Sequence, residues 1–271
     1  MLEVTPLNNN DSYVDKQKEL HKKLTKYYDK RYGHEFSILF QKYWNSEILA
    51  LCHPSNESIV IDFGCGTGIL FPDCAKQYNS IVGFDLSYDM ITKASRTIPQ
   101  VKGCVIGDGT YLPFADDSTD LVICRSALHH LPHLDKTLLE IKRVLKTNGV
   151  FVFSEPSNDN FLIRLSRFMM YRVSSRFDER DVAFVTIELV QRLEQLGFSV
   201  EFVKQFGFLS YLFCGFPDHF PLMVYVPFSD QVARLLILLD KLFVRVPILR
   251  NQSFHVIIKV TKNIDIGNSK K

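Results

Sequence analysis

The amino-acid sequence predicts an α/β fold with one large domain built on a mainly parallel sheet. Short runs of β-branched and aromatic residues recur along the chain and alternate with stretches of helical periodicity. One of these runs, residues 59–61, leads into a glycine-rich turn, as is typical where a strand passes into a helix in α/β sheets. A chain of 271 residues with 46% hydrophobic content can bury the sizeable core that such a sheet needs.

The glycine-rich turn predicts a cofactor site. Residues 59–70 read IVIDFGCGTGIL, so that the strand ends in Asp62 and the glycines alternate at 64, 66 and 68. Glycine has no Cβ, which lets the backbone come close to a ligand, and the next helix offers free N–H groups. The dinucleotide fingerprint has its third glycine where Ile69 stands, and the spacing here therefore indicates a different nucleotide-type cofactor.

Two further acidic residues extend this pattern. Asp85 ends the apolar run 81–84, and Asp108 follows a third apolar run. An acidic residue about 20 residues beyond the glycine turn, at the end of the second strand, accepts hydrogen bonds from ribose hydroxyls. Turn residues after strands are often Asp, but three such residues in this order favour a shared cofactor site over three unrelated turns.

The rest of the alternation follows in order. A fourth strand at 121–124 precedes the residues Leu-His-His-Leu, and a helix is expected at 134–145. The turn 146–149 predicts a helix end with Gly149 in the left-handed conformation. A fifth strand at 150–153, a helix at 186–196, a sixth strand at 198–203 and a seventh at 253–260 complete the expected sheet.

The motif D-x-G-x-G-x-G, with the two later acids in this order, resembles the class I S-adenosylmethionine-dependent methyltransferases. The resemblance covers roughly residues 28–203 and a final strand at 253–261, and it is nearest to the small-molecule branch that includes quinone-biosynthesis methyltransferases. It implies an enzyme with a Rossmann-like seven-stranded sheet, six strands parallel and one antiparallel, with helices on both faces. It also implies S-adenosyl-L-methionine as cofactor and S-adenosyl-L-homocysteine as product.

The resemblance assigns the cofactor to the loops after the first four strands. Asp85 is expected at the ribose and Asp108 at the adenine. The residues that we expect to bind the cofactor are Asp62, Gly64, Cys65, Gly66, Thr67, Gly68, Asp85, Leu86, Met90, Gly107, Asp108, Gly109, Arg125 and Ser126.

His129 and His130 are the candidate catalytic residues. They follow the fourth strand, where the substrate approaches in this fold, and histidine titrates near neutral pH. A base is needed only if the accepting atom carries a proton. The alternative is that both rings only hold the loop, and Glu155 faces the substrate or anchors a turn. The sequence has no N-P-P-Y-type motif of a DNA methyltransferase and no carboxylate cluster for a metal.

Three further segments complete the predicted organisation: an N-terminal helical cap at 1–51, the methyltransferase domain at 52–262 and a tail at 263–271. Within the domain, an amphipathic helix forms a lid at about 157–182 or an ordinary surface helix. In the lid interpretation its basic side meets an anionic substrate or an anionic membrane surface. The candidate substrate contacts are Arg164, Arg167 and Phe168.

The last feature is a helical, apolar insert at about 206–251, between the last two strands. Charges and prolines interrupt its apolar runs, none of which reaches the roughly 18 residues of a membrane span. We expect it to form a homodimer interface, a hydrophobic substrate wall or a face that lies on a bilayer, in addition to core packing.

Composition narrows the function classes. A net charge of +2 gives no sign of nucleic-acid binding, and six scattered cysteines favour reduced thiols in the cytoplasm, with or without peripheral membrane contact. The expected activity is methyl transfer to oxygen or nitrogen of a hydrophobic, lipid-like small molecule, in small-molecule biosynthesis or secondary metabolism. The alternatives are C-methylation of a quinone-type ring and a non-catalytic cofactor-binding scaffold.

Overall fold

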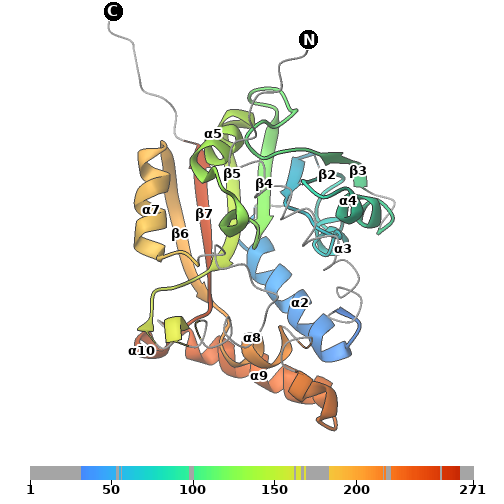
Figure 1. The fold of residues 1–271 in the computed structure, drawn as a ribbon, viewed down its shortest axis with the longest axis vertical. Helices are drawn as coiled ribbons and strands as arrows, with labels where there is room; N and C mark the ends of the chain where they lie inside the picture. Colours follow the sequence, from blue (N-terminus) through green and yellow to red (C-terminus); the bar gives the residue numbers. More distant parts are fainter. Residues whose placement is uncertain are drawn as a thin grey trace, which may run out of the picture.

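The computed structural model describes residues 32–52, 55, 57–97, 101–161, 163–165, 168, 183–215, 217, 221–250 and 252–262. These residues form one seven-stranded sheet with the strand order β3-β2-β1-β4-β5-β7-β6 (Figure 1). The strands are β1 (Ile59–Phe63), β2 (Ser80–Asp85), β3 (Val101–Ile106), β4 (Thr119–Arg125), β5 (Leu145–Pro156), β6 (Phe198–Phe206) and β7 (His255–Lys262).

The pairing confirms the predicted sheet of six parallel strands and one antiparallel strand. Parallel ladders join β1 to β2 and β4, β2 to β3, and β4 to β5. Strand β7 runs antiparallel to both of its neighbours, β5 and β6. The carboxyl ends of the six parallel strands therefore lie at one edge of the sheet, where ligands bind in open α/β sheets.

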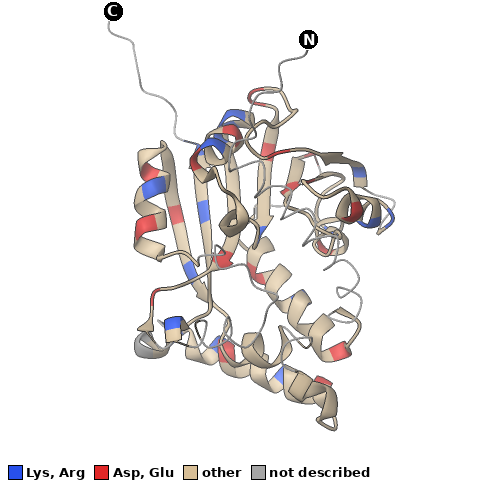
Figure 2. Ribbon diagram, viewed as in Figure 1, with Lys and Arg blue, Asp and Glu red and all other residues tan. Residues whose placement is uncertain are grey.

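Helices cover both faces of the sheet, as predicted. Charges of both signs are interspersed along the ribbon (Figure 2). In chain order the helices are α2 (Glu35–Leu49), α3 (Phe71–Cys74), α4 (Tyr88–Ala94), the 3₁₀ turn η1 (Leu128–His130), α5 (Leu134–Val144), α7 (Thr186–Gln195), α8 (Leu209–Cys214), the 3₁₀ turn η2 (Pro221–Tyr225), α9 (Ser229–Phe243) and α10 (Pro247–Arg250).

The alternation of apolar side chains along the strands builds two separate cores. In β4, Ile123 belongs to the core that contains α2, α3 and α8, whereas Val122 and Cys124 belong to the core beneath α5 and α7. In β5, Val152 faces the first core, and Phe151 and Phe153 face the second. Successive side chains of a strand point to opposite faces, and the strand patterns are therefore apolar throughout.

The helical insert lies between β6 and β7 and packs against α2. Helix α9 runs along the base of the molecule in Figure 1 and contacts α2 and α8. Asp240, fully buried on the inner side of α9, accepts hydrogen bonds from the backbone N–H groups of Phe208 (3.0 Å), Leu209 (2.9 Å) and Ser210 (3.2 Å), and from the Ser210 hydroxyl. One carboxylate thus satisfies the free N–H groups at the start of α8.

The turn from α5 into β5 differs from the prediction at one residue. Asn148, with φ of 64°, adopts the left-handed conformation that was expected of Gly149. Asn tolerates this conformation because its short side chain can bond locally. Glycine is still needed at 149, because a Cβ there would lie 2.8 Å from the carbonyl oxygen of Lys146.

The predicted division into cap, domain and tail lies partly outside the described residues. Helix α2 belongs to the expected cap, while residues 1–31, most of the expected lid and the tail at 263–271 are not described. These boundaries remain predictions.

Replacing Asp240 with alanine should strongly destabilise the insert. The change leaves four donors without their acceptor inside the protein, and we expect a loss of roughly 3 kcal/mol or more in the free energy of unfolding, measured by urea denaturation. Asp230→Ala, in the first turn of the same helix, is the matched control and should cost less than about 1 kcal/mol. Equal losses in the two variants would contradict this role of Asp240.

Candidate active site

Three predicted acids lie together at the carboxyl edge of the sheet. Asp62 is the last residue but one of β1, Asp85 ends β2, and Asp108 follows β3. These three strands are neighbours in the sheet. Asp62 and Asp85 are buried, whereas Asp108 is exposed and its carboxylate accepts a hydrogen bond from the N–H of Thr110 at 2.8 Å. The edge therefore gathers three carboxyl groups, two of them buried and one exposed.

The glycine turn is held close to the sheet by its neighbours. The N–H groups of Gly64 and Cys65 both donate to the carbonyl of Phe84, at 2.8 and 3.1 Å. A Cβ on Gly64 would lie 2.4 Å from the Cβ of Ala127, so only glycine fits between the loops after β1 and β4. Gly66, with φ of 52°, has no atom within 4 Å of its Cβ position, which means that open space adjoins the turn there.

Asp85 connects the glycine turn to the start of α4. One carboxylate oxygen accepts from the N–H of Gly66 at 2.9 Å, and the other accepts from the N–H of Ser87 at 2.8 Å. Burial raises the pKa of the Asp85 carboxyl, while these N–H groups oppose the rise. Each carboxylate oxygen has two lone pairs, so Asp85 can still accept from a ligand hydroxyl.

Two buried polar atoms at this edge have no partner in the described part of the chain. They are one carboxylate oxygen (Oδ2) of Asp62, in β1, and the hydroxyl of Ser126, just after β4. Ser126 also has the left-handed φ of 55°, which is uncommon for a serine and marks a constrained loop. Buried polar groups are normally satisfied, and unsatisfied ones at a loop edge indicate a missing ligand or water.

The other predicted cofactor residues lie in the same loops. Thr67 accepts a hydrogen bond from the Thr97 hydroxyl at its carbonyl, and Met90 is buried on α4. Cβ atoms added at Gly107 and Gly109 would lie 2.8 and 2.7 Å from the rings of Phe84 and Phe63, so packing alone demands glycine at both positions. The remaining expected cofactor residues are Gly68, the last glycine of the turn after β1, and Leu86, which lies between β2 and α4.

Arg125 is directed to α2. Its guanidinium donates to the side-chain oxygens of Asn45 (2.6 Å) and Gln41, and its carbon lies 4.2 Å from the centre of the Trp44 ring. Asn45 in turn donates to Asp73 at 2.8 Å. Sequence reasoning missed Gln41 and Asn45, although polar residues four apart on an otherwise apolar helix face were a usable signal.

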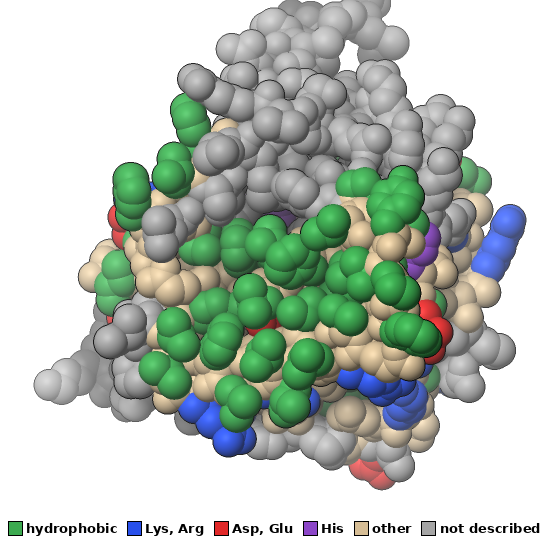
Figure 3. Space-filling model, turned by 90° about the horizontal axis from the view of Figure 1, so that it is seen from below, with side chains coloured by type: hydrophobic (Ala, Val, Ile, Leu, Met, Phe, Trp, Pro, Cys, Tyr) green, Lys and Arg blue, Asp and Glu red, His purple; other side chains and the backbone are tan. Residues whose placement is uncertain are grey.

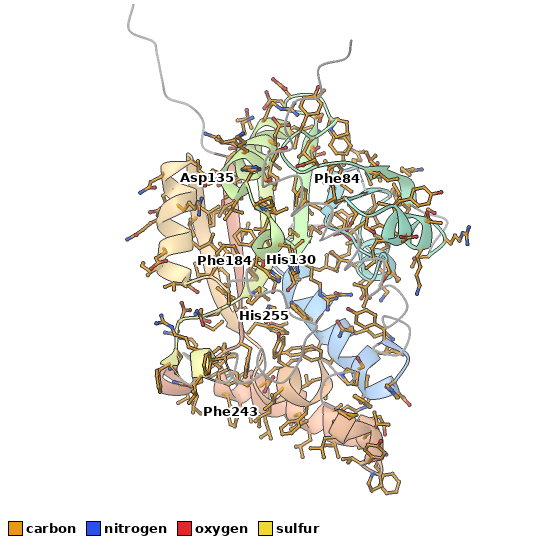
Figure 4. All side chains as sticks on the ribbon, in the orientation of Figure 1. Phe84, His130, Asp135, Phe184, Phe243 and His255 are labelled. Atoms are coloured by element: carbon orange, nitrogen blue, oxygen red, sulfur yellow. The ribbon has the colours of Figure 1, made fainter. Side chains whose placement is uncertain are left out.

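A buried carboxylate holds one of the two candidate histidines. Glu155, fully buried at the end of β5, accepts at 2.7 Å from Nδ1 of His129. The same carboxylate accepts from the N–H groups of Ala127 (3.0 Å) and Leu128 (2.8 Å). Glu155 therefore anchors the turn η1, one of the two alternatives considered for it, and fixes the orientation of the His129 ring. Figure 4 shows the neighbouring His130 near the lower ends of the strands.

The candidate substrate residues are only partly described. Arg164 is exposed and donates to the carbonyl of Asn158 at 2.7 Å, Phe168 is exposed, and Arg167 lies outside the described residues. Their substrate contacts remain predictions.

Burial of Cys65 disfavours its thiolate form. Burial raises the pKa of its thiol well above the usual value, and the nearby acids Asp62 and Asp85 raise it further. The thiol stays protonated and packs as a small apolar side chain. Among the described residues, no group of three or more His, Cys, Asp or Glu is placed to hold a metal ion.

Known proteins are similar to the part of the chain that forms this edge of the sheet. Residues 61–153 match the family model of a methyltransferase domain. The chain is 33% identical over 122 residues to the uncharacterized methyltransferase YcgJ of Bacillus subtilis, covering 41% of this chain and 48% of that protein. It is 30% identical over 135 residues to the demethylmenaquinone methyltransferase of Lactiplantibacillus plantarum, covering 47% of this chain and 57% of that protein.

Solved structures share the fold. The structure of an S-adenosylmethionine-dependent methyltransferase from Aquifex aeolicus superposes with a TM-score of 0.53 at 14% identity, covering 81% of this chain and 89% of that one. The chain spans about half the length of the first relatives that it matches. The match over residues 61–153 agrees with the predicted methyltransferase domain, for which the predicted cofactor is S-adenosyl-L-methionine.

The residues at the edge of the sheet fit this cofactor. S-adenosylmethionine carries positive charge at its sulfonium and ammonium groups, and a buried carboxylate oxygen without a partner, as on Asp62, favours a cation. Its ribose presents two hydroxyls, for which Asp85 and the Ser126 hydroxyl are available, and the open space at Gly66 allows close approach. Contacts between these four residues and the cofactor remain predictions.

Asp62 should make the ligand-free protein less stable as the pH rises. Burial raises the pKa of its carboxyl from the usual 3.8 to about 8, with Arg125 opposing and Asp85 reinforcing the rise. Between these two values the folded state keeps a proton that the unfolded state has lost, so stability falls with increasing pH, by at most about 1.4 kcal/mol per unit.

Asp62→Asn removes this titration. We expect the Tm of the ligand-free variant to exceed that of the wild type by a margin that widens from about pH 5 to about pH 8, measured by differential scanning fluorimetry. Comparing the two proteins at each pH cancels the titration of all other groups. Parallel Tm profiles would show that Asp62 ionises normally.

Proposed function

We propose that this chain, which carries a class I S-adenosylmethionine-dependent methyltransferase domain, transfers a methyl group to an oxygen or nitrogen of a hydrophobic small molecule. The observation that supports this most directly is the convergence of Asp62 and Asp85 beside the open glycine turn, inside the matched domain. The cofactor, when bound, supplies an already activated methyl group, so the protein mainly has to position the accepting atom.

Each part of the edge has a role in this proposal. Asp85 holds the ribose, and Asp62 offers its free oxygen to the positively charged part of the cofactor. Gly66 leaves room for both because it carries no side chain. These roles use short, charge-assisted hydrogen bonds, which are about twice as strong as neutral ones.

His129 is the proposed general base. With the proton on Nδ1, from which it is donated to Glu155 in a hydrogen bond, Nε2 of His129 carries the lone pair that takes up a proton. A histidine oriented by a buried carboxylate is a recurrent arrangement for proton abstraction from hydroxyl and amine groups.

Aromatic side chains in the loops of the carboxyl edge favour an apolar acceptor. Tyr88 is the first residue of α4, which follows β2, Tyr111 lies in the turn after β3, and Phe161 lies in a helical segment after β5; all three are exposed. Exposed aromatic residues near a polar centre are typical of sites for hydrophobic ligands.

C-methylation of a quinone-type ring is the second candidate. Two of the matched relatives are named demethylmenaquinone methyltransferase, one from Lactiplantibacillus plantarum and one from Lactobacillus johnsonii. The two candidates differ in the product, because methylation at a ring carbon leaves every acceptor hydroxyl free. Mass spectrometry of the product from a demethylated naphthohydroquinone distinguishes them.

Asp85→Ala should weaken cofactor binding. The loss of the hydrogen bonds that ribose hydroxyls donate to a carboxylate costs roughly 1.5–3 kcal/mol, or about a 10- to 150-fold increase in Kd for S-adenosylmethionine in isothermal titration calorimetry. Asp116→Ala, which removes an exposed carboxylate paired with Arg143, is the control and should leave the Kd unchanged. A folded Asp85→Ala protein with wild-type affinity would place the ribose elsewhere, and a wild-type protein that binds no cofactor would refute the proposed function.

His129→Ala should lower kcat by roughly 100-fold or more for an acceptor that must lose a proton. The measurement is transfer of a labelled methyl group to a panel of hydrophobic phenols, amines and hydroquinones.

Glu155→Gln should also reduce kcat and change its pH dependence near neutrality, because it disturbs the orientation of the His129 ring. His133→Ala, at the start of α5, serves as the control. Full activity of His129→Ala would exclude it as the base, and no turnover by the wild type on any acceptor would favour a scaffold.

A further inference from the structure

Helix α9 and the neighbouring turn η2 present an apolar surface to solvent at the base of the molecule. Figure 3 shows this surface from below as a field of hydrophobic side chains with Lys and Arg along parts of its margin. We call it the basal face. Its exposed hydrophobic members are Leu222, Val224, Tyr225, Phe228, Leu235, Leu238, Leu242, Val246 and Leu249. We propose that the basal face binds the surface of an anionic lipid bilayer.

The geometry of α9 leaves this face without a partner in the described part of the chain. Ala233 and Asp240 are on the buried side of the helix, toward α2 and α8. Leu235, Leu238 and Leu242 follow one another at intervals of three and four residues, which places them on one face, opposite the buried side. The helix is therefore apolar on two sides, and folding covers only one of them.

Two aromatic residues extend the basal face at the start of α9. Tyr225 is 81% and Phe228 is 74% exposed. Phe228 has a φ of 56° and a ψ of 37°, in the left-handed region that is costly for a bulky side chain. A conformation of this kind persists only where something favours it, and it is a recurrent feature of ligand-binding segments. Aromatic side chains are enriched where proteins meet the boundary between lipid and water.

The charges beside the basal face select the partner. Residues 221–250 contain four basic residues, Arg234, Lys241, Arg245 and Arg250, all exposed, and two acidic residues. One of the acids, Asp240, is buried against its four donors and contributes nothing to the surface. Basic residues on the flank of an apolar helix face are the pattern of helices that lie in the interface of anionic membranes.

The same charges disfavour a second copy of the chain as the occupant. In a twofold dimer through the basal face, Arg234, Lys241 and Arg245 of one copy would share the interface with the same residues of the other, and like charges at an interface are unfavourable. No helix in the described residues is long and apolar enough to cross a bilayer. Binding in the plane of the lipid headgroups, with leucines and aromatic rings inserted, is the arrangement that satisfies both findings.

The test is sedimentation of the full chain with vesicles, and it does not depend on methyl transfer. The two vesicle types are phosphatidylcholine alone and phosphatidylcholine mixed with phosphatidylglycerol. We expect binding to the mixed vesicles, weaker binding at high salt because the basic residues are screened, and little binding to phosphatidylcholine alone. The double variant Leu235→Gln/Leu238→Gln should reduce binding at least about tenfold.

The matched control is Leu139→Gln/Ile187→Gln on α5 and α7. Leu139 is 47% exposed and Leu235 and Leu238 are each 54% exposed, so the two double variants remove similar apolar surface from different sides. The control should bind as the wild type does. Because the substituted side chains are exposed, both variants should keep the wild-type Tm, which is measured alongside.

Three results would overturn the proposal. The first is a wild type that binds neither vesicle. The second is equal binding to both vesicle types, which would remove the role of the basic residues. The third is a dimer, in light scattering without lipid, that Leu235→Gln/Leu238→Gln converts to a monomer, because the basal face would then be a contact between two copies. Loss of cofactor binding in other variants has no bearing on these outcomes.

Discussion

The hydrogen bonds to the buried carboxylate of Glu155 are the interaction on which the carboxyl edge of the sheet depends. Glu155 lies in β5 and reaches the residues that follow β4, where three backbone N–H groups and the His129 ring all bond to it. A buried charge is tolerated only when such donors surround it, so the loop after β4 has little freedom to adopt another conformation. Ala127, in that loop, is the residue against which Gly64 of the cofactor turn packs. The loop that Glu155 holds is therefore in direct contact with the glycine turn.

Asp62 shows the opposite balance. Its carboxylate is as deeply buried, but one oxygen has no partner among the described residues, and burial raises its pKa to about 8. The folded protein retains a group that costs stability in the absence of ligand. Binding of a cation removes this cost. The free energy that the buried Asp62 carboxyl costs the ligand-free protein therefore contributes to cofactor affinity. Strained or unsatisfied groups of this kind concentrate at functional sites.

The insert has two apolar sides, and only one of them is buried. Its inner side belongs to the core, because α9 packs on α2 and α8 and Asp240 caps the start of α8. Its outer side has the composition of a core and the exposure of a surface, and this combination underlies the proposal of lipid binding. The expectation of partial core packing was right, while a substrate wall and a dimer interface remain untested.

The sequence by itself determined the succession of the strands along the chain and the edge of the sheet at which the candidate site lies. Asp62, Asp85 and Asp108 each follow an apolar run, and in a parallel sheet every such run ends at the same edge, so local pattern was sufficient. Only the tertiary structure decided the partners of the polar side chains. Arg125 meets Gln41 across 84 positions, Glu155 meets His129 across 26, and Asp240 meets Ser210 across 30. Packing of distant elements selects such pairs. The local spacing of residues therefore does not predict these pairs. It also did not predict that Asn148, rather than Gly149, adopts the left-handed conformation.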